Sequence, residues 1–289
     1  MRPRQTTAPP GLTASPIAYA GEPGAFAEDA VVVAFGESAP RLPFGGFREV
    51  FEAVTSGVAA SGVVPIENLV NGSVREVYDL LLEHELQITA EVVVPVDLCL
   101  AALPGRTLDD IERVYSHIQA LGQAERFLRS RPWTLLTTYN TAGAGKYVRD
   151  QGDRGAAAVL SRRAGDAYGL EVLADSIQDV PDNRTRFLVV GPAGPAPDPG
   201  VGQAFKTTIA FGVRNEPGTL LAALRVFAGR SINLSKLESR PSRSAAWEYV
   251  FWADLDAHRD EPECAAALEK LTSVATMVRV LGTYPRAVS

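Results

Sequence analysis

The chain contains few of the residues that bind metal ions or form disulfides. Among its 289 residues there are only two cysteines and three histidines. Cys99 and Cys264 lie far apart in apolar surroundings, which predicts buried free thiols and a reducing, cytoplasmic location. His84, His117 and His258 have no ligand spacing such as HxxxH, so we expect neither a metal nor another cofactor.

Long apolar runs and blocks of like charge are also missing. The longest apolar stretches, VVVPVDLCLAAL and AAAVL, are interrupted or too short to cross a bilayer, so no membrane partner is expected. Residues 1–16 lack the apolar core of a signal peptide and are interpreted as a disordered tail. The 28 basic and 34 acidic residues give a net charge of −6 without clusters, which argues against a nucleic-acid partner.

The chain does have an alternation of strand and helix patterns over its first 190 residues, which predicts an α/β fold. Pro95 predicts that one strand ends and another begins there, with a crossing between lobes formed by 17–95 with 175–190 and by 96–174. Residues 191–205, rich in Gly and Pro, are predicted to be a linker. Beyond them, the order βαββαβ predicts a ferredoxin-like domain over residues 206–285.

Local patterns also predict where individual helices begin. Ser73 followed by Glu76 has the spacing of a capping box and predicts a helix over VREVYDLLLEHEL. Thr141 is predicted to start the helix TAGAGKYVRD. The stretches AFAEDAVVVAF, TLDDIERV and ALGQAERFLRS are each predicted to be one helix.

A polar turn at residues 179–187 precedes a predicted strand at residues 187–190. Thr185 and Arg186 would lie at the mouth of this strand, and α/β proteins bind ligands at strand ends. Such residues are also ordinary at strand edges. Another predicted strand is followed by Glu67 and Asn68. We interpret Glu67 as an acceptor for loop amides, whereas the Asn68 amide could donate to a substrate oxygen.

Four further residues lie at predicted helix N-termini, which can hold a carboxylate: Gly21, Ser116, His117 and Thr141. Gln119 adds a polar group in the same turn as Ser116. The glycine spacing around Gly21 is not GxGxxG, and such glycines also serve tight turns that bind nothing. A lone histidine is often a capping or packing group. Both interpretations therefore stay open.

Eight stretches together resemble the prephenate and arogenate dehydratases of phenylalanine biosynthesis, from about Ile17 to Tyr284: AYAGEPGAF, VPIENLVNGSV, VYSHIQAL, NTAGAGKYV, YGLEVLADSIQD, NRTRFLVV, PGTLLAAL and INLSKLESRP. The last two resemble an ACT domain. The resemblance implies a catalytic domain like two-lobed periplasmic binding proteins of type II. It also implies prephenate dehydratase activity, a carbon-oxygen lyase reaction that yields phenylpyruvate.

The resemblance implies a catalytic set of Thr185, Asn68 and Gln119, with Thr185 hydrogen-bonding the leaving oxygen. It implies that Arg186 pairs with a substrate carboxylate. The remaining expected substrate-binding residues are Phe187, Ser116, His117, Thr141, Glu67 and Gly21.

An ACT domain implies a site for L-phenylalanine as allosteric effector, with these expected contacts: Asn215, Pro217, Gly218, Thr219, Leu220, Asn233, Leu234, Glu238, Ser239 and Arg240. A helix N-terminus after Gly218 would hold the carboxylate, and Glu238 would meet the ammonium. Without the resemblance, the same residues are a turn and a solvated pair. Because ACT domains usually bind ligands between two copies, we expect a homodimer or homotetramer.

The chain departs from the family at several positions. Ala25, Ala27 and Leu69 stand where many relatives carry hydroxyl groups, and Ile118 stands where many carry proline. Two alternatives therefore stay open: an enzyme that prefers arogenate or only decarboxylates prephenate, and a non-catalytic amino-acid sensor. No chorismate mutase segment fits before Ile17, so a monofunctional dehydratase is expected.

Overall fold

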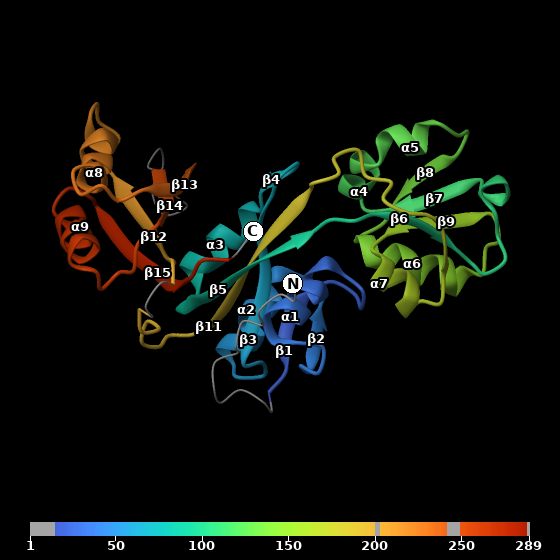
Figure 1. Cartoon of the computed structure of the whole chain (residues 1–289), viewed down its shortest axis with the longest axis horizontal. Helices are drawn as coiled ribbons and strands as arrows, with labels where there is room; N and C mark the ends of the chain where they lie inside the picture. The colour runs from blue at the N-terminus through green and yellow to red at the C-terminus, as the bar shows by residue number, and fades with distance from the viewer. Residues whose placement is uncertain (1–14, 200–202, 242–248, 288–289) are drawn as a thin grey trace. The chain divides into compact units, whose positions relative to one another are not determined.

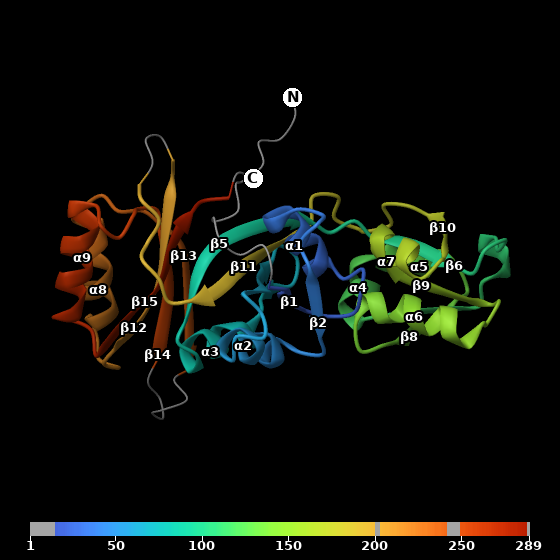
Figure 2. The same cartoon turned by 90° about the horizontal axis from the view of Figure 1, so that it is seen from below.

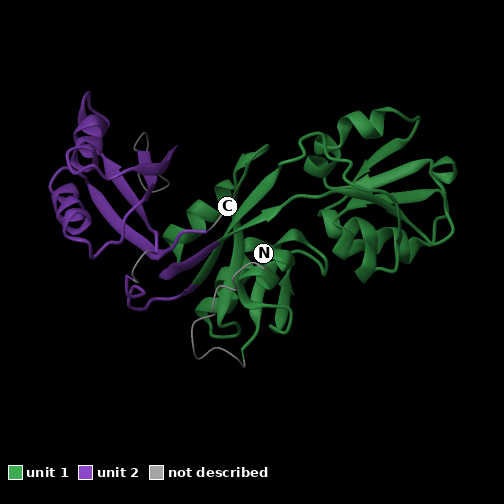
Figure 3. Cartoon of the chain, viewed as in Figure 1, with its two compact units in different colours: residues 1–84, 92–190 green, residues 85–91, 191–289 purple. Residues whose placement is uncertain are grey.

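The computed structural model describes residues 15–199, 203–241 and 249–287. The predicted tail up to residue 14, part of the predicted linker at 200–202 and the predicted strand start at 245–248 lie outside the described residues. The chain forms two compact units (Figure 3). Unit 1 comprises Met1–His84 and Val92–Val190, and unit 2 comprises Glu85–Glu91 and Gly191–Ser289.

The first sheet of unit 1 has the strand order β2-β1-β3-β11-β5, with the short β4 paired to β3. Strand β1 is parallel to both β2 and β3, whereas β11 is antiparallel to β3. Its strands are β1 (Ile17–Ala20), β2 (Arg41–Phe44), β3 (Ser61–Asn68), β4 (Gly72–Ser73), β5 (Leu86–Pro95) and β11 (Arg184–Pro192). The helices of this part of the chain are α1 (Phe26–Phe35), α2 (Phe47–Thr55) and α3 (Arg75–Glu83).

The second sheet has the order β10-β6-β9-β7-β8, in which β7 is parallel to β8 and β9. Its strands are β6 (Cys99–Ala102), β7 (Arg113–Ser116), β8 (Thr134–Thr137), β9 (Ala156–Leu160) and β10 (Glu171–Ala174). Four helices, α4 (Ile118–Gln123), α5 (Glu125–Arg129), α6 (Thr141–Gln151) and α7 (Arg162–Ala167), follow its strands. Strand β9 is buried along its whole length, as its run of alanine, valine and leucine predicts.

Two extended segments join the two lobes of unit 1 (Figure 1). One follows β5 and the other precedes β11, and they hydrogen-bond to each other. The Val96 amide donates to the Asn183 carbonyl over 2.8 Å, and the Ile177 amide donates to the Leu98 carbonyl over 2.9 Å. The predicted break between two strands at Pro95 is confirmed, because β5 ends at this residue.

Several expected boundaries were wrong. Ser73 belongs to β4 and α3 starts after Val74 without a side-chain cap, because Ser73 pairs with β3 instead. The helix expected over TLDDIERV is a single 3-10 turn, Leu108–Asp110, with Thr107 as its N-cap residue. The helix expected over ALGQAERFLRS is divided into α4 and α5 at Ala124.

Unit 2 is a four-stranded antiparallel sheet of order β13-β14-β12-β15. Its elements are β12 (Phe205–Val213), α8 (Thr219–Ala228), β13 (Leu234–Pro241), β14 (Tyr249–Leu255), α9 (Pro262–Thr272) and β15 (Met277–Pro285). Both helices lie on one face of the sheet (Figure 2), where Phe227 and Leu271 pack with Phe211. The βαββαβ order predicted from the sequence is confirmed.

Both cysteines are buried free thiols, as predicted. Burial raises the pKa of the Cys99 thiol and of the Cys264 thiol to about 11, so neither is a thiolate at neutral pH. Among the described residues, no helix is long and apolar enough to cross a membrane.

Candidate active site

Thr185 and Asn68 face each other across the antiparallel pair β3 and β11. Asn68 is the last residue of β3 and Thr185 is the second residue of β11, so Thr185 lies at the mouth of its strand, as predicted. The Asn68 side-chain amide Nδ2 donates to Thr185 Oγ1 over 2.9 Å, to Asn183 Oδ1 over 3.0 Å and to the Arg184 carbonyl over 3.1 Å. Asn68 therefore holds the Thr185 hydroxyl in a defined position.

The orientation of the Asn68 amide follows from its other contacts. Its Oδ1 accepts from the backbone amides of Val70 and Asn71 at 3.0 and 2.9 Å, and backbone amides can only donate. The atom that meets Thr185 is therefore the nitrogen, and Thr185 Oγ1 must accept this hydrogen bond. The proton of the Thr185 hydroxyl is left to donate to another oxygen.

Glu67 and Arg186 form the next pair along the same two strands. Arg186 Nε donates to Glu67 Oε1 over 2.7 Å, and Arg186 is only 9% exposed. Because successive strand residues point to opposite faces, this pair lies on the face of the sheet opposite to Thr185 and Asn68. In the structure, the carboxylate that Arg186 meets is that of Glu67. Its predicted contact with substrate stays a prediction, as does that of the buried Phe187.

The second lobe places three further predicted residues at the end of β7. Ser116 is fully buried, and its hydroxyl donates to the Val159 carbonyl over 2.6 Å, which ties β7 to β9. His117 caps α4 by accepting from the Gln119 amide through Nδ1 over 3.3 Å. Burial lowers the pKa of His117, so its imidazole is neutral at neutral pH. The Gln119 side chain is exposed, next to an Ile118 side chain that is also exposed.

Gly21 directly follows β1, and Thr141 lies at the start of α6. The Gly21 amide donates to the Phe44 carbonyl over 2.8 Å, so this amide already has a partner within the first sheet. Thr141 is the first residue of α6, as predicted, and the Asn140 side chain caps that helix by accepting from the Gly143 amide over 2.5 Å. The expected substrate contacts of Gly21 and Thr141 stay predictions.

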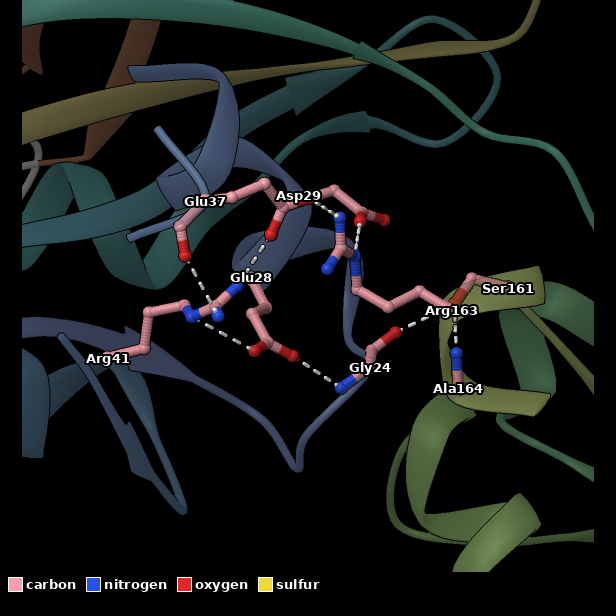
Figure 4. A network of polar contacts seen from close by, with 8 residues as sticks. All are labelled: Gly24, Glu28, Asp29, Glu37, Arg41, Ser161, Arg163 and Ala164. Carbon is pink, nitrogen blue, oxygen red and sulfur yellow. Dashed lines mark hydrogen bonds and ion pairs between the residues drawn. The ribbon is translucent and has the colours of Figure 1, made fainter. Parts of the chain in front are cut away.

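A network of polar contacts joins the two lobes (Figure 4). Ser161 Oγ donates to the Gly24 carbonyl over 2.7 Å, and Arg163 pairs with Asp29 at 2.5 Å and with Glu37 at 2.9 Å. Burial raises the pKa of the Asp29 carboxyl, against the opposing effect of Arg163.

A second set of contacts joins the same lobes at Glu22. Its carboxylate accepts from the Tyr139 hydroxyl over 2.9 Å and pairs with Lys146 at 3.3 Å. Burial, together with the bond to Glu22, raises the pKa of Tyr139 to about 12. Neither set of contacts was predicted from the sequence. The one local signal is Ser161, a favourable N-cap residue, which caps α7.

A cavity of about 840 Å³ also lies between the lobes. It includes none of Thr185, Asn68 and Gln119, and carboxylates outnumber guanidiniums in its lining. All three of its arginines are paired within the chain: Arg163 with Asp29, Arg41 with Glu28 and Arg162 with Asp175. It is therefore a poor site for an anion, and we place the candidate site at Thr185. The residues lining the cavity are Pro23, Phe26, Glu28, Asp29, Val33, Arg41, Val94, Pro95, Asp97, Ser161, Arg162, Arg163, Asp166 and Ala167.

In unit 2, the residues expected to bind an effector fall into two groups. Asn215, Pro217, Gly218, Thr219 and Leu220 surround the start of α8, and Asn233, Leu234, Glu238, Ser239 and Arg240 lie before or along β13. Gly218 has a φ of 89° and precedes α8. Thr219 Oγ1 donates to the Arg214 carbonyl over 2.6 Å, and Asn233 Nδ2 donates to Asp256 over 2.7 Å. Effector binding by these residues stays a prediction.

The architecture defines a class of protein: a two-lobed α/β domain followed by a small ferredoxin-like domain. The family profile described as prephenate dehydratase matches residues 17–194, and the ACT domain profile matches residues 207–272. The chain belongs to the prephenate dehydratase family and carries an ACT domain, as the sequence motifs predict.

Among curated relatives, the bifunctional chorismate mutase/prephenate dehydratase of Aquifex aeolicus is 39% identical over 273 residues, covering 94% of this chain and 74% of that protein. Arogenate dehydratase/prephenate dehydratase 2 of Arabidopsis thaliana is 40% identical over 278 residues, covering 93% of this chain and 72% of that protein.

Two solved structures are also similar. Prephenate dehydratase from Arthrobacter aurescens in complex with L-Phe has a TM-score of 0.85 and 32% identity, covering 94% of this chain and 92% of that one. GqqA, described as a novel type of quorum quenching acylase, has a TM-score of 0.86 and 32% identity, covering 94% and 98%.

Proposed function

We propose that this chain converts prephenate into phenylpyruvate by decarboxylative dehydration, with Thr185 assisting the loss of the ring hydroxyl. The observation that supports this proposal is the hydrogen bond from Asn68 Nδ2 to Thr185 Oγ1. Because the threonine oxygen accepts this bond, its proton is free to donate to a leaving oxygen. Family membership supplies the substrate class.

The reaction requires little from the protein. The bond between the ring and its carboxylate breaks, its electron pair enters the ring, and carbon dioxide is released. The ring carbon–oxygen bond breaks with its pair, so hydroxide leaves and becomes water when it gains a proton. A threonine hydroxyl is too weak an acid for easy proton loss. Thr185 therefore acts by hydrogen-bonding the departing oxygen as negative charge develops on it.

The similarity to the acylase GqqA does not favour an acyl-transfer reaction for this chain. Acyl transfer by a threonine requires a base hydrogen-bonded to the hydroxyl, which takes its proton. The partner of Thr185 is the amide nitrogen of Asn68, which is a donor and no base. This arrangement favours donation of a hydrogen bond by Thr185 over nucleophilic attack.

Regulation belongs to the same proposal. We expect L-phenylalanine to bind unit 2 near the start of α8 and β13. The ACT domain supports this expectation, and a related structure from Arthrobacter aurescens was solved with L-Phe. The expected oligomer and the cytoplasmic location are further parts of the proposal. Arogenate is the alternative substrate, because the Arabidopsis relative is named for both activities.

One assay tests the proposal: product formation from prephenate and from arogenate, each with and without phenylalanine. Prephenate should yield phenylpyruvate. Thr185→Val, which removes the hydroxyl at nearly constant volume, should lower kcat by about 100-fold or more. Thr185→Ser, which keeps the hydroxyl, should retain measurable turnover. Unimpaired turnover by Thr185→Val would contradict the mechanism. Phenylalanine binding without turnover of either substrate would favour the non-catalytic sensor.

A further inference from the structure

Asn183 lies where the second interlobe segment meets β11, two residues before Thr185. It is only 1% exposed. Its backbone carbonyl accepts from the Val96 amide of the other interlobe segment over 2.8 Å. Its side-chain Oδ1 accepts from Asn68 Nδ2 over 3.0 Å. One buried residue thus contacts both the connection between the lobes and the amide that holds Thr185.

The orientation of the Asn183 side chain can be deduced from that of Asn68. Backbone amides fix Asn68 Oδ1, so Asn68 presents its nitrogen to both Asn183 and Thr185. The atom of Asn183 that meets this donor must therefore be the oxygen. The other atom, Asn183 Nδ2, is buried and has no hydrogen-bond partner among the described residues.

A buried amide without a partner costs free energy, so packing alone does not explain an asparagine at this position. A leucine of similar size would bury no polar atom. The asparagine is explained if its oxygen performs a task that a hydrocarbon cannot. The task visible in the structure is to accept from Asn68 Nδ2, which also donates to Thr185 Oγ1.

We propose that Asn183 is a positioning residue for the dehydration, acting through Asn68 on Thr185. Its oxygen fixes the plane of the Asn68 amide. That amide occupies the lone-pair side of Thr185 Oγ1 and directs the hydroxyl proton toward the leaving oxygen. The backbone bond to Val96 ties this alignment to the interlobe connection. The inference rests on the proposed function and adds a residue that does not itself contact substrate.

The test compares Asn183→Leu with Asn183→Asp in the full-length protein. Asn183→Leu removes both the useful oxygen and the unpaired nitrogen, so a purely structural role predicts unchanged or higher thermal stability and unchanged kcat. The positioning role predicts a loss of kcat of about 10- to 100-fold with KM nearly unchanged, because only the alignment of the donor is lost. Asn183→Asp keeps an acceptor oxygen and should restore kcat toward the wild-type value.

A third comparison asks whether Asn183 acts through Asn68. Asn68→Ala and the double variant Asn68→Ala/Asn183→Leu should have the same kcat, because the second change has nothing left to disturb. Additive losses would overturn the proposal, as would wild-type kcat in Asn183→Leu, a change confined to KM, or equal losses in the Leu and Asp variants. If Asn183→Leu fails to fold, Asn183→Ala, which also removes the oxygen, replaces it in both comparisons, and wild-type kcat in Asn183→Ala would then overturn the proposal. A wild-type protein without turnover of prephenate or arogenate would instead refute the proposed function itself, and this inference with it.

Discussion

A single glycine sets how closely the two lobes of unit 1 approach each other. Gly24 has a φ of +86°, and a Cβ atom built on it would lie 2.3 Å from Ala164 Cα in the other lobe. Such a distance is far below van der Waals contact, and the atom it meets is backbone. Alanine at position 24 must therefore push α7 away and break the bond from Ser161 to the Gly24 carbonyl.

We expect Gly24→Ala to weaken lobe closure and to lower kcat/KM by about tenfold or more, because catalytic geometry between lobes is lost. Gly36→Ala is the matched control. Gly36 has nearly the same φ, +88°, but no atom lies within 4 Å of its Cβ position. Both variants should share the backbone strain of alanine at positive φ. Only Gly24→Ala should also increase the radius of gyration in small-angle scattering. Equal kcat/KM in the two variants would contradict this role.

At the scale of single residues, sequence motifs predicted Thr185 and Asn68 as site residues but not the contact between them. The polar turn around Thr185 and the amide at Asn68 were both visible as patterns. Their hydrogen bond depends on the register of β3 against β11, which joins residues 117 positions apart. Asn183 was interpreted only as a turn former, because its burial cannot be seen in the sequence. Long-range register was thus the missing information.

At the scale of elements, the starts of α6 and α3 were both predicted to within one residue, but the predicted cap of α3 was wrong. Asn140 and the small residues after it define the start of α6 locally, through a cap within one turn. The start of α3 also has a capping pattern at Ser73, but β3 competes for that residue and pairs with it. The local preference of a residue for a helix cap is overridden where a strand can pair with the same backbone.

His117 makes the start of α4 sensitive to pH. Its Nδ1 accepts from the Gln119 amide, and a protonated ring could not accept this bond. Burial lowers the pKa of His117 below its ordinary value of about 6.5. The unfolded chain therefore binds this proton more readily than the folded one. The stability that His117 contributes is present above about pH 6.5 and is lost as pH falls through the lower, folded-state pKa.

The variant His117→Asn keeps a capping oxygen at this position but does not titrate. We expect the melting temperature of the wild-type protein to fall more between pH 7 and pH 5 than that of His117→Asn, as measured by circular dichroism. At pH 7 the two proteins should differ little, because asparagine is a favourable N-cap residue. An equal fall in the melting temperature of the two proteins between pH 7 and pH 5 would show that protonation of His117 does not cause the loss of stability.

At the scale of the whole molecule, one strand contributes to both units. Glu85–Glu91 belongs to unit 2, while Val92–Pro95 of the same strand β5 belongs to unit 1 and continues into the interlobe segment. The sequence pattern predicted β5 as part of the catalytic domain only. Within unit 2, its carboxylate Glu91 is 6% exposed and pairs with Lys206 at 2.9 Å. The Ala287 amide also donates to Glu91, over 3.0 Å.

Breaking this buried pair should therefore destabilise the end of β5. Glu91→Gln leaves a buried ammonium and Lys206→Met leaves a buried carboxylate, so each should lower the free energy of unfolding by about 3 kcal/mol or more. The double variant removes both charges and should lose less than either single change. Glu83→Gln is the control. It breaks the exposed pair of Arg48 with Glu83, which should contribute only about 0 to 1 kcal/mol.

Because β5 is continuous, we expect the single variants at Glu91 and Lys206 to lose prephenate turnover and phenylalanine binding over the same range of denaturant. Unfolding of unit 2 removes residues 85–91 from their partners and frees the segment that leads to Val96 and Asn183. Chemical denaturation followed by activity and by calorimetric phenylalanine binding measures both losses. Two separate transitions, with turnover persisting after binding is lost, would mean that β5 does not couple the units.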